Sequence, residues 1–145
     1  MSCWTHIAAV IRIDALIGNE SRARVQRRQI RKILGKECHY EDSNEVWEDA
    51  EKHPEKYLPM GSEGSLEMTI HTNPNKHCLA AYTVTIFGDL RDCGYSKEEM
   101  ETEYINWFKQ KIKELNKFFG IRQATITATN GYWTVNFACP EERRD

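Results

Sequence analysis

The stretch LAAYTVTIFG, residues 79–88, decides the expected fold, because its β-branched and aromatic residues predict a strand. A second run, LEMTIHT at residues 66–72, alternates apolar and polar residues as a half-buried strand does. The sequence NPNKH at residues 73–77 separates the two runs and is rich in turn-forming residues. These three segments together predict an antiparallel hairpin in the middle of the chain.

Helical patterns flank this hairpin on both sides. Asn19 is a helix N-cap residue, and the helix that it opens is predicted to run to Leu34 and to end at Gly35. After the hairpin, Ser96 and Glu99 form a capping box for a second helix that ends at Gly120. The buried stripe of this second helix is spaced three and four residues apart and comprises Ile105, Phe108, Ile112, Leu115 and Phe119.

Strand patterns lie at both ends of the chain. Residues 4–14, WTHIAAVIRID, are apolar and β-branched enough for a central strand. Residues 124–129 and 132–138 predict two more strands, joined by a type I′ turn at Asn130 and Gly131. The resulting order is β-α-β-β-α-β-β.

The first six of these elements match the split β-α-β, or ferredoxin-like, arrangement. We therefore expect an α+β fold with an antiparallel sheet, two helices on one face and an extra C-terminal strand. A length of 145 residues predicts a single domain, residues 1–145. Residues 37–64 form an acidic and largely irregular insertion, in which residues 44–53 predict a short helix.

The composition, with 40% hydrophobic and 29% charged residues, is typical of a soluble protein. The mean hydropathy is −0.68, and the longest apolar stretch, residues 7–17, is interrupted by Arg12 and Asp14. We therefore expect neither a membrane span nor a signal peptide, and a cytoplasmic location. Five cysteines, an odd number without a C-x-x-C pair, also favour a reducing compartment.

Three polar stretches are expected to meet at one end of the sheet. If the first and third strands are adjacent and antiparallel, residues 4–6, 61–65 and 88–92 converge there. The ligand-binding candidates are Trp4, His6, Glu63, Gly64, Ser65, Asp89, Arg91 and Asp92. In a functional interpretation Arg91 binds an anion, the Gly-Ser loop offers backbone N–H groups and His6 holds a proton or hydrogen bond. In a structural one, Arg91 pairs with a neighbouring carboxylate and ties loops to the sheet.

The first helix is strongly basic and suggests a second kind of ligand. Its nucleic-acid candidates are Arg22, Arg24, Arg27, Arg28, Arg31 and Lys32, which can follow a phosphate backbone. The acidic segment that follows can instead fold back and neutralise these charges, or both segments can be solvated. The net charge of −2 and the lack of aromatic residues beyond Trp4 in the first strand count against nucleic acid.

The sequence supports metal binding and covalent catalysis less well than it supports ligand or nucleic-acid binding. The Cys/His pairs, at residues 3 and 6, 38 and 39, and 77 and 78, lack the spacing of structural zinc sites, so no metal and no cofactor is expected. Cys93 lies close in sequence to Arg91, which leaves a small Cys/His-dependent enzyme as an alternative. No residue is assigned a catalytic role, and the more natural expectation is a protein that is not an enzyme.

The segments WTH at residues 4–6, SEGS at residues 62–65 and GDLRD at residues 88–92 resemble small uncharacterised proteins of bacteriophages and prophages. The resemblance implies a phage-related accessory protein and supplies no activity. We therefore expect a non-enzymatic protein of the host cytoplasm that binds a host protein or a small anionic ligand, for example in counter-defence. A nucleic-acid-binding module is the alternative, and a homodimer through the edge strand at residues 132–138 remains open.

Overall fold

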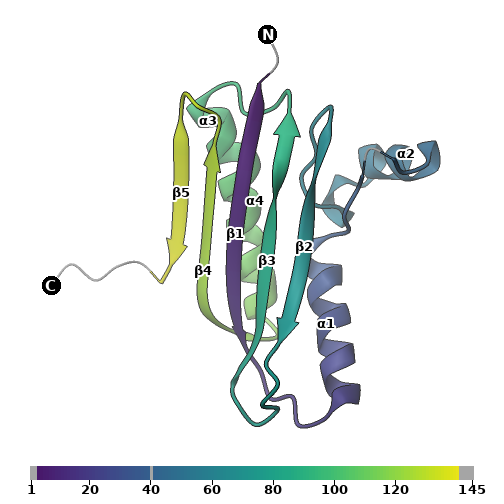
Figure 1. Cartoon of the computed structure of the whole chain (residues 1–145), viewed down its shortest axis with the longest axis vertical. Helices are drawn as coiled ribbons and strands as arrows, with labels where there is room; N and C mark the ends of the chain where they lie inside the picture. The colour runs from purple at the N-terminus through teal and green to yellow at the C-terminus, as the bar shows by residue number, and fades with distance from the viewer. Residues whose placement is uncertain (1–2, 40, 141–145) are drawn as a thin grey trace, which may run out of the picture.

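The computed structural model describes residues 3–39 and 41–140 and contains a five-stranded antiparallel sheet (Figure 1). Its strands are β1 (Trp4–Asp14), β2 (Gly64–Thr72), β3 (Ala80–Arg91), β4 (Gly120–Thr129) and β5 (Thr134–Cys139). They lie in the order β2-β3-β1-β4-β5, and every neighbouring pair is antiparallel. The expected α+β class, with the first and third strands adjacent and antiparallel, is confirmed.

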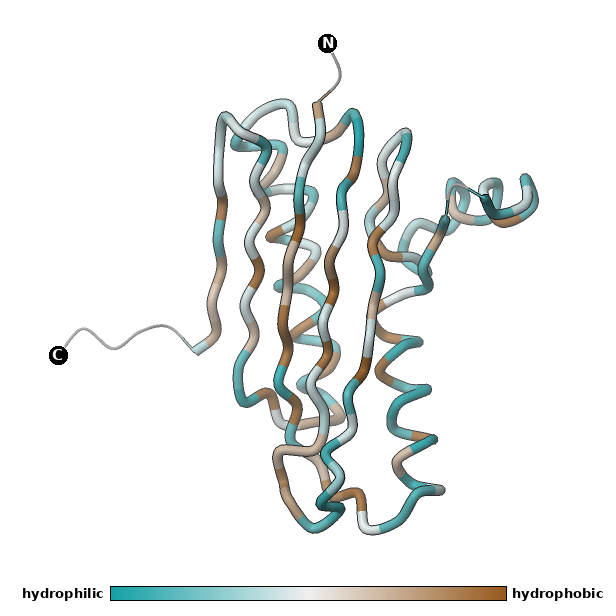
Figure 2. Tube along the Cα trace, in the orientation of Figure 1, coloured by the Kyte–Doolittle hydropathy of each residue, from teal (hydrophilic) through white to brown (hydrophobic). Residues whose placement is uncertain are grey.

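The two faces of the sheet differ because side chains alternate along each strand. In β1, Ile7, Ala9, Ile11 and Ile13 are buried, whereas the residues that alternate with them, 8, 10 and 12, are exposed. Figure 2 shows hydrophobic and hydrophilic residues alternating along β2, whereas the middle of β1 is continuously apolar. In Figure 1, α4 (Asn106–Asn116) lies behind the sheet and α1 (Glu20–Leu34) lies along its β2 edge, while the face toward the viewer is not covered by a described helix. The main core therefore lies between one sheet face and these helices.

The helix boundaries follow the predicted caps. The Asn19 side chain accepts a hydrogen bond from the Arg22 backbone N–H, and Gly35 follows the last helical residue with φ +119°. The second helical region is not continuous: α3 (Lys97–Met100) leads into a π-helical turn, η2 (Glu101–Ile105), and then into α4. The whole predicted apolar stripe is buried, but the π-helical turn buries Tyr104 beside Ile105 as well.

The third strand extends farther than its sequence pattern predicts. The pattern placed the end of the strand at Gly88, but β3 continues to Arg91. A Cβ atom at Gly88 would lie 2.2 Å from the Ser65 carbonyl oxygen of β2. The glycine therefore permits two strands to approach closely and does not end one.

The predicted type I′ turn between β4 and β5 is wrong. Thr129 pairs with Thr134, which leaves a four-residue loop. Among the described non-glycine residues only Asp92, which lies elsewhere, has a positive φ. Asn130 therefore lacks the left-handed conformation that a type I′ turn requires. Its side-chain oxygen instead accepts hydrogen bonds from the backbone N–H groups of Tyr132 and Trp133, both at 3.0 Å.

The acidic segment is more regular than expected and forms a small unit beside the sheet. It contains α2 (Asn44–Lys52), which confirms the predicted short helix, and a 3-10 turn, η1 (Pro54–Lys56). Cys38, Ala50 and Tyr57 form its buried centre, and Trp47 packs against them. Among the described residues, none of the helices combines the length and the apolar character needed to cross a membrane.

Candidate functional site

The predicted ligand-binding residues converge at one end of the sheet, as the topology required. Trp4 pairs with Arg91 and His6 with Asp89 between β1 and β3, while Ser65 pairs with Asp89 between β2 and β3. Glu63 lies directly before β2, and Asp92 directly after β3. The strand-end charges of three segments therefore belong to one cluster, which we call the sheet-end cluster.

Most charges of the sheet-end cluster are already paired with one another. His6 Nδ1 lies 2.5 Å from Asp89 Oδ1, and Arg91 Nη1 donates to Glu63 Oε1 at 2.8 Å. Asp92 accepts hydrogen bonds from the Ser62 hydroxyl at 2.7 Å and the Tyr95 hydroxyl at 3.0 Å. These two hydrogen bonds, the Ser62 bond first, hold the pKa of the Asp92 carboxyl below its ordinary value. The pairs tie the loops at this end to the sheet.

A shallow cavity of about 360 Å³ adjoins this cluster on the uncovered sheet face. It is lined by Trp4, Gly64, Ser65, Glu67, Phe87, Gly88 and Asp89. The lining carries two carboxylates and, within the described part of the chain, neither an arginine nor a lysine. An anion therefore finds little electrostatic attraction there.

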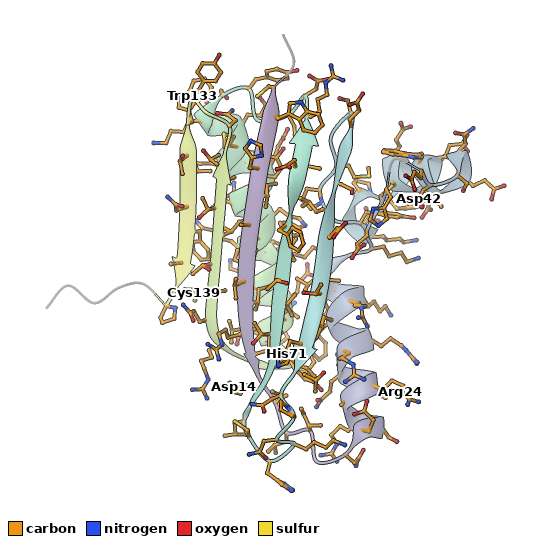
Figure 3. The ribbon with its side chains drawn as sticks, viewed as in Figure 1. Asp14, Arg24, Asp42, His71, Trp133 and Cys139 are labelled. Carbon is orange, nitrogen blue, oxygen red and sulfur yellow. The ribbon has the colours of Figure 1, made fainter. Side chains whose placement is uncertain are left out.

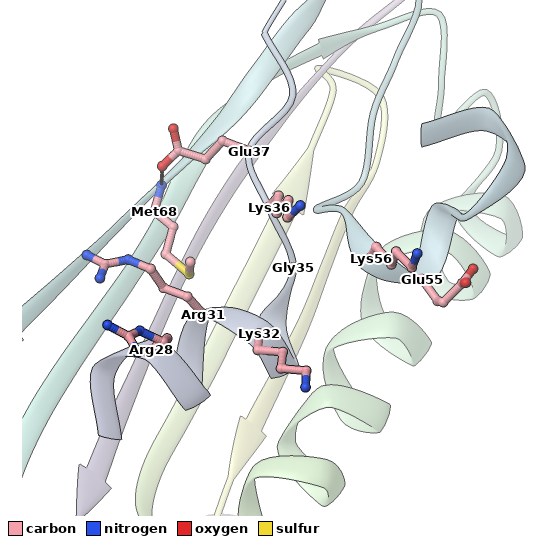
Figure 4. A pocket seen from close by; sticks show the side chains of 9 residues that line it. All are labelled: Arg28, Arg31, Lys32, Gly35, Lys36, Glu37, Glu55, Lys56 and Met68. Carbon is pink, nitrogen blue, oxygen red and sulfur yellow. Dashed lines mark hydrogen bonds between the residues drawn. The ribbon is translucent and has the colours of Figure 1, made fainter. Parts of the chain in front are cut away.

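A larger cavity of about 750 Å³ lies at the C-terminal end of α1, where η1 and the edge strand β2 complete its walls (Figure 4). We call it the basic cavity, because five of its nine lining residues are basic. The lining comprises Arg28, Arg31, Lys32, Gly35, Lys36, Glu37, Glu55, Lys56 and Met68. In Figure 4 the Arg28 and Arg31 guanidinium groups lie on the side of Met68, while Lys36 and Lys56 come from two separate segments.

Local sequence and one close contact assemble the basic cavity. Residues 28, 31 and 32 are three and four positions apart, so their side chains project from the same side of α1. At Gly35 a Cβ atom would lie 2.7 Å from the Tyr57 carbonyl carbon, so only glycine lets the two segments approach this closely. The Lys36 N–H then donates to the Lys56 carbonyl at 2.8 Å, which places both lysines at one wall.

The positive charge of this cavity is largely uncompensated. Glu37 accepts a hydrogen bond from the Met68 N–H at 2.8 Å and pairs with His39 at 2.9 Å, while Glu55 lies 3.4 Å from His53. None of the five basic side chains forms an ion pair with a described residue. Five basic and two acidic residues leave a net charge of +3 in a chain whose total is −2.

The basic residues predicted for nucleic acid fall into two groups. Arg28, Arg31 and Lys32 line the basic cavity, but Arg27 donates to Glu20 at 2.8 Å and to Thr72 at 3.0 Å. Arg22 and Arg24 lie in the first two turns of α1 and outside the cavity, and Figure 3 shows Arg24 on the outer side of the helix. Among the described residues, the acidic segment forms no ion pair with any of these six basic residues of α1.

Lys36 and Lys56 were not among the sequence candidates. They lie twenty positions apart, and the isolated parallel pairing of Lys36 with Tyr57 brings their segments together. The signal available in the sequence was Gly35, which was interpreted only as a helix end. Its lack of a side chain also serves the contact with residues 57 and 58.

The cysteine that the sequence singled out, Cys93, is not an activated nucleophile in this structure. Cys93 is buried, and burial raises the pKa of its thiol, which disfavours the thiolate. All five cysteines are free. Across residues 3–39 and 41–140, no three His, Cys, Asp or Glu side chains gather into a metal-binding group.

Comparisons of the chain with protein-family models, with curated proteins and with solved structures find no match.

Proposed function

We propose that this protein is a non-enzymatic binding protein whose ligand is a small anion carrying phosphate groups. The observation that carries the proposal is the basic cavity of about 750 Å³, whose five cations have no ion-pair partner among the described residues. The proposed ligand site is therefore the C-terminal end of α1 and not the sheet-end cluster.

The physical reason is the mutual repulsion of the cations. Unpaired like charges around one cavity repel each other, and a bound anion removes that cost. Arg28 and Arg31 can each donate two parallel hydrogen bonds to a phosphate group, whereas lysines act as mobile point charges. Met68 and the aliphatic stems of the long side chains offer contact to an organic part of the ligand.

Two further parts belong to the same proposal. The sheet order β2-β3-β1-β4, with its two helices on one face, supports a ferredoxin-like fold in which β5 is an added edge strand. A phage-encoded accessory protein of the kind that the sequence resembles would act in the host cytoplasm by sequestering such an anion. Blocking a host protein is the other mode of action open to it.

The test is calorimetric titration with sodium pyrophosphate and with ATP at low ionic strength. Arg31→Gln and Lys36→Gln alter exposed side chains, and each is expected to weaken binding about tenfold through the loss of a charge-assisted hydrogen bond. Arg24→Gln is the matched control, since it removes the same charge from the same helix outside the cavity. Its affinity is expected to stay close to that of the unaltered chain.

Two results would overturn the proposal. If neither pyrophosphate nor ATP bound in low salt, the proposed anion site would be wrong. Equal weakening by Arg24→Gln and Arg31→Gln, together with tighter and steeply salt-dependent binding of a single-stranded oligonucleotide, would favour the nucleic-acid alternative, because each displaced counterion adds to the salt dependence.

A further inference from the structure

A separate cavity of about 440 Å³ lies between the segment around η1 and the helical region α3-η2-α4. Tyr57, Asp92, Glu99, Glu103, Tyr104 and Trp107 are among its lining residues. We call it the acidic cavity, because three carboxylates line it and no arginine, lysine or histidine of the described chain does. It shares no lining residue with the basic cavity.

Two of its carboxyl groups lie close together on successive helical turns. Burial raises the pKa of the Glu103 carboxyl, and the neighbouring Glu99 carboxyl raises it further. The Glu99 carboxylate also accepts a hydrogen bond from the Tyr95 N–H at 3.0 Å, which fixes its position. Two carboxyl groups therefore lie together at the cavity, and no cation among its described lining residues opposes them.

Two buried polar groups of the same lining lack hydrogen-bond partners. Tyr104 is 1% exposed, and neither its hydroxyl nor the Trp107 indole Nε1 makes a hydrogen bond of ordinary geometry with any described residue. The hydroxyl lies close to the Cys93 thiol and the Glu103 carboxyl, which line the cavity too. More than about 90% of buried polar groups in proteins are hydrogen-bonded. The Trp107 N–H, and the Tyr104 hydroxyl beside it in the lining, are therefore available to an acceptor on a ligand.

The helix geometry at this point is also unusual. Tyr104 belongs to the π-helical turn η2, and Trp107 follows in the next turn. Single π-helical turns within α-helices are rare and frequently occur at functional sites. The turn here directs an aromatic residue into the wall of a cavity instead of only continuing the apolar stripe.

We propose that the acidic cavity binds a small organic cation that carries a hydrogen-bond acceptor beside its charged nitrogen. The nitrogen lies between the Glu99 and Glu103 carboxylates, where charge-assisted hydrogen bonds hold it. The body of the ligand packs against the Trp107 and Tyr57 rings, whose π faces also attract a cation. The ligand acceptor receives the Tyr104 hydroxyl and the Trp107 N–H.

The test uses two matched probes, phenylalaninamide and 3-phenylpropanamide, which differ only in the ammonium group. Proton–nitrogen NMR spectra of the full chain follow the Trp107 indole signal, assigned with Trp107→Phe. At pH 6, where an α-amino group is protonated, phenylalaninamide is expected to shift this signal and to bind about tenfold more tightly than the neutral amide.

Variants of the carboxylates test the placement of the cation. Glu103→Gln and Glu99→Gln are expected to weaken phenylalaninamide binding about tenfold, because each loses a charged acceptor. Glu101→Gln is the matched control, since it removes the same charge from the same turn but does not line the cavity. Tyr104→Phe is expected to weaken binding, because the ligand acceptor loses one of its two donors.

Any of three results would overturn the proposal: an unshifted Trp107 signal with millimolar phenylalaninamide, equal affinity for the two probes, or equal weakening by Glu101→Gln and Glu103→Gln. None of them bears on pyrophosphate binding at the basic cavity, so the two proposals fail separately.

Discussion

The charged residues that end β3 are individually modest contributors to stability. The Arg91–Glu63 and His6–Asp89 pairs are partly or largely exposed, and exposed pairs of this kind contribute under about 1 kcal/mol each. Their effect is to hold the segments around residues 63 and 92 against the sheet. Thr5, a fully buried polar residue at the same end, is expected to contribute more to stability, because its surroundings exclude water.

Replacement of Thr5 by valine is expected to destabilise the protein. Thr5 is 0% exposed, and its hydroxyl donates to the Cys93 carbonyl at 2.8 Å. Valine has the same shape but leaves that carbonyl buried without its donor, at a cost of about 1–3 kcal/mol. Urea unfolding measures the difference. Thr127→Val, which removes an exposed hydrogen bond to Asn136, is the control and is expected to change the free energy of unfolding by less than about 0.5 kcal/mol.

The Tyr57–Asp49 hydrogen bond predicts a specific pH dependence of stability. The Tyr57 hydroxyl donates to Asp49 Oδ2 at 2.6 Å, which lowers the pKa of Asp49 from 3.8 and raises the pKa of Tyr57 from 10.0 to about 12. The Asp49 contribution is therefore present above pH 3.8 and is lost as the pH falls through its lower folded value. The Tyr57 contribution is present below pH 10.0 and is lost as the pH rises toward about 12.

Urea unfolding of the unaltered chain and of Tyr57→Phe across this range checks the expectation. The stability difference should be constant near neutral pH and should shrink in acid. Tyr132→Phe, at a residue that is 75% exposed, should show no such change. A difference for Tyr57→Phe that persists unchanged in strong acid would mean that the Asp49 bond does not form in solution.

Among the elements, the β2-β3 pair shows how glycine can be misinterpreted in a strand. Gly64 begins β2 and Gly88 lies within β3, and at both positions a Cβ atom would clash with the backbone of the neighbouring strand. A strand pattern that stops at glycine is therefore cut short when the glycine serves a close approach. The same contact brings Asp89 to Ser65 and so forms part of the sheet-end cluster.

Gly64→Ala is expected to cost more than about 3 kcal/mol, because its Cβ would lie 1.9 Å from the Asp89 carbonyl oxygen at φ +82°. Gly131→Ala is the matched control. Its φ is +88°, but nothing lies within 4 Å, so only the strain of the left-handed conformation, about 1–2 kcal/mol, is expected. Equal losses in thermal or urea unfolding would show that strand contact contributes nothing beyond backbone conformation.

At the scale of the whole molecule, one short segment separates two cavities of opposite charge. Glu55 and Lys56 line the basic cavity, whereas Pro54 and Tyr57 line the acidic cavity. This segment is held by the small cluster of Cys38, Ala50 and Tyr57, apart from the main core. Both proposed sites therefore depend on a unit that is less extensively buried than the sheet.

Hydrogen exchange is expected to show this difference directly. Amides of α2 should exchange at a lower opening free energy than those around Ile11 in β1, which is 0% exposed and belongs to the main core. Pyrophosphate should slow exchange around Lys56, because a ligand of the basic cavity holds η1 against α1. Uniform opening free energies across the chain would contradict a separately opening unit.

From the sequence alone, the order of the main helices and strands could be predicted, and so could the end of the sheet at which three polar segments meet. The caps at Asn19 and Ser96 and the spacing of the apolar residues sufficed, because these features act within a few residues or through the period of a strand or helix. The adjacency of the first and third strands then followed from the order of elements.

Only the tertiary structure decided which charges are free. Arg91 and His6 find carboxylates across the sheet end, while Arg28, Arg31 and Lys36 meet Lys56 without an ion-pair partner among the described residues. The π-helical turn and the polar groups of Tyr104 and Trp107 at the acidic cavity are likewise visible only in the tertiary structure. The physical reason is that ion pairing and cavity formation depend on distances between segments far apart in sequence, which no local pattern records.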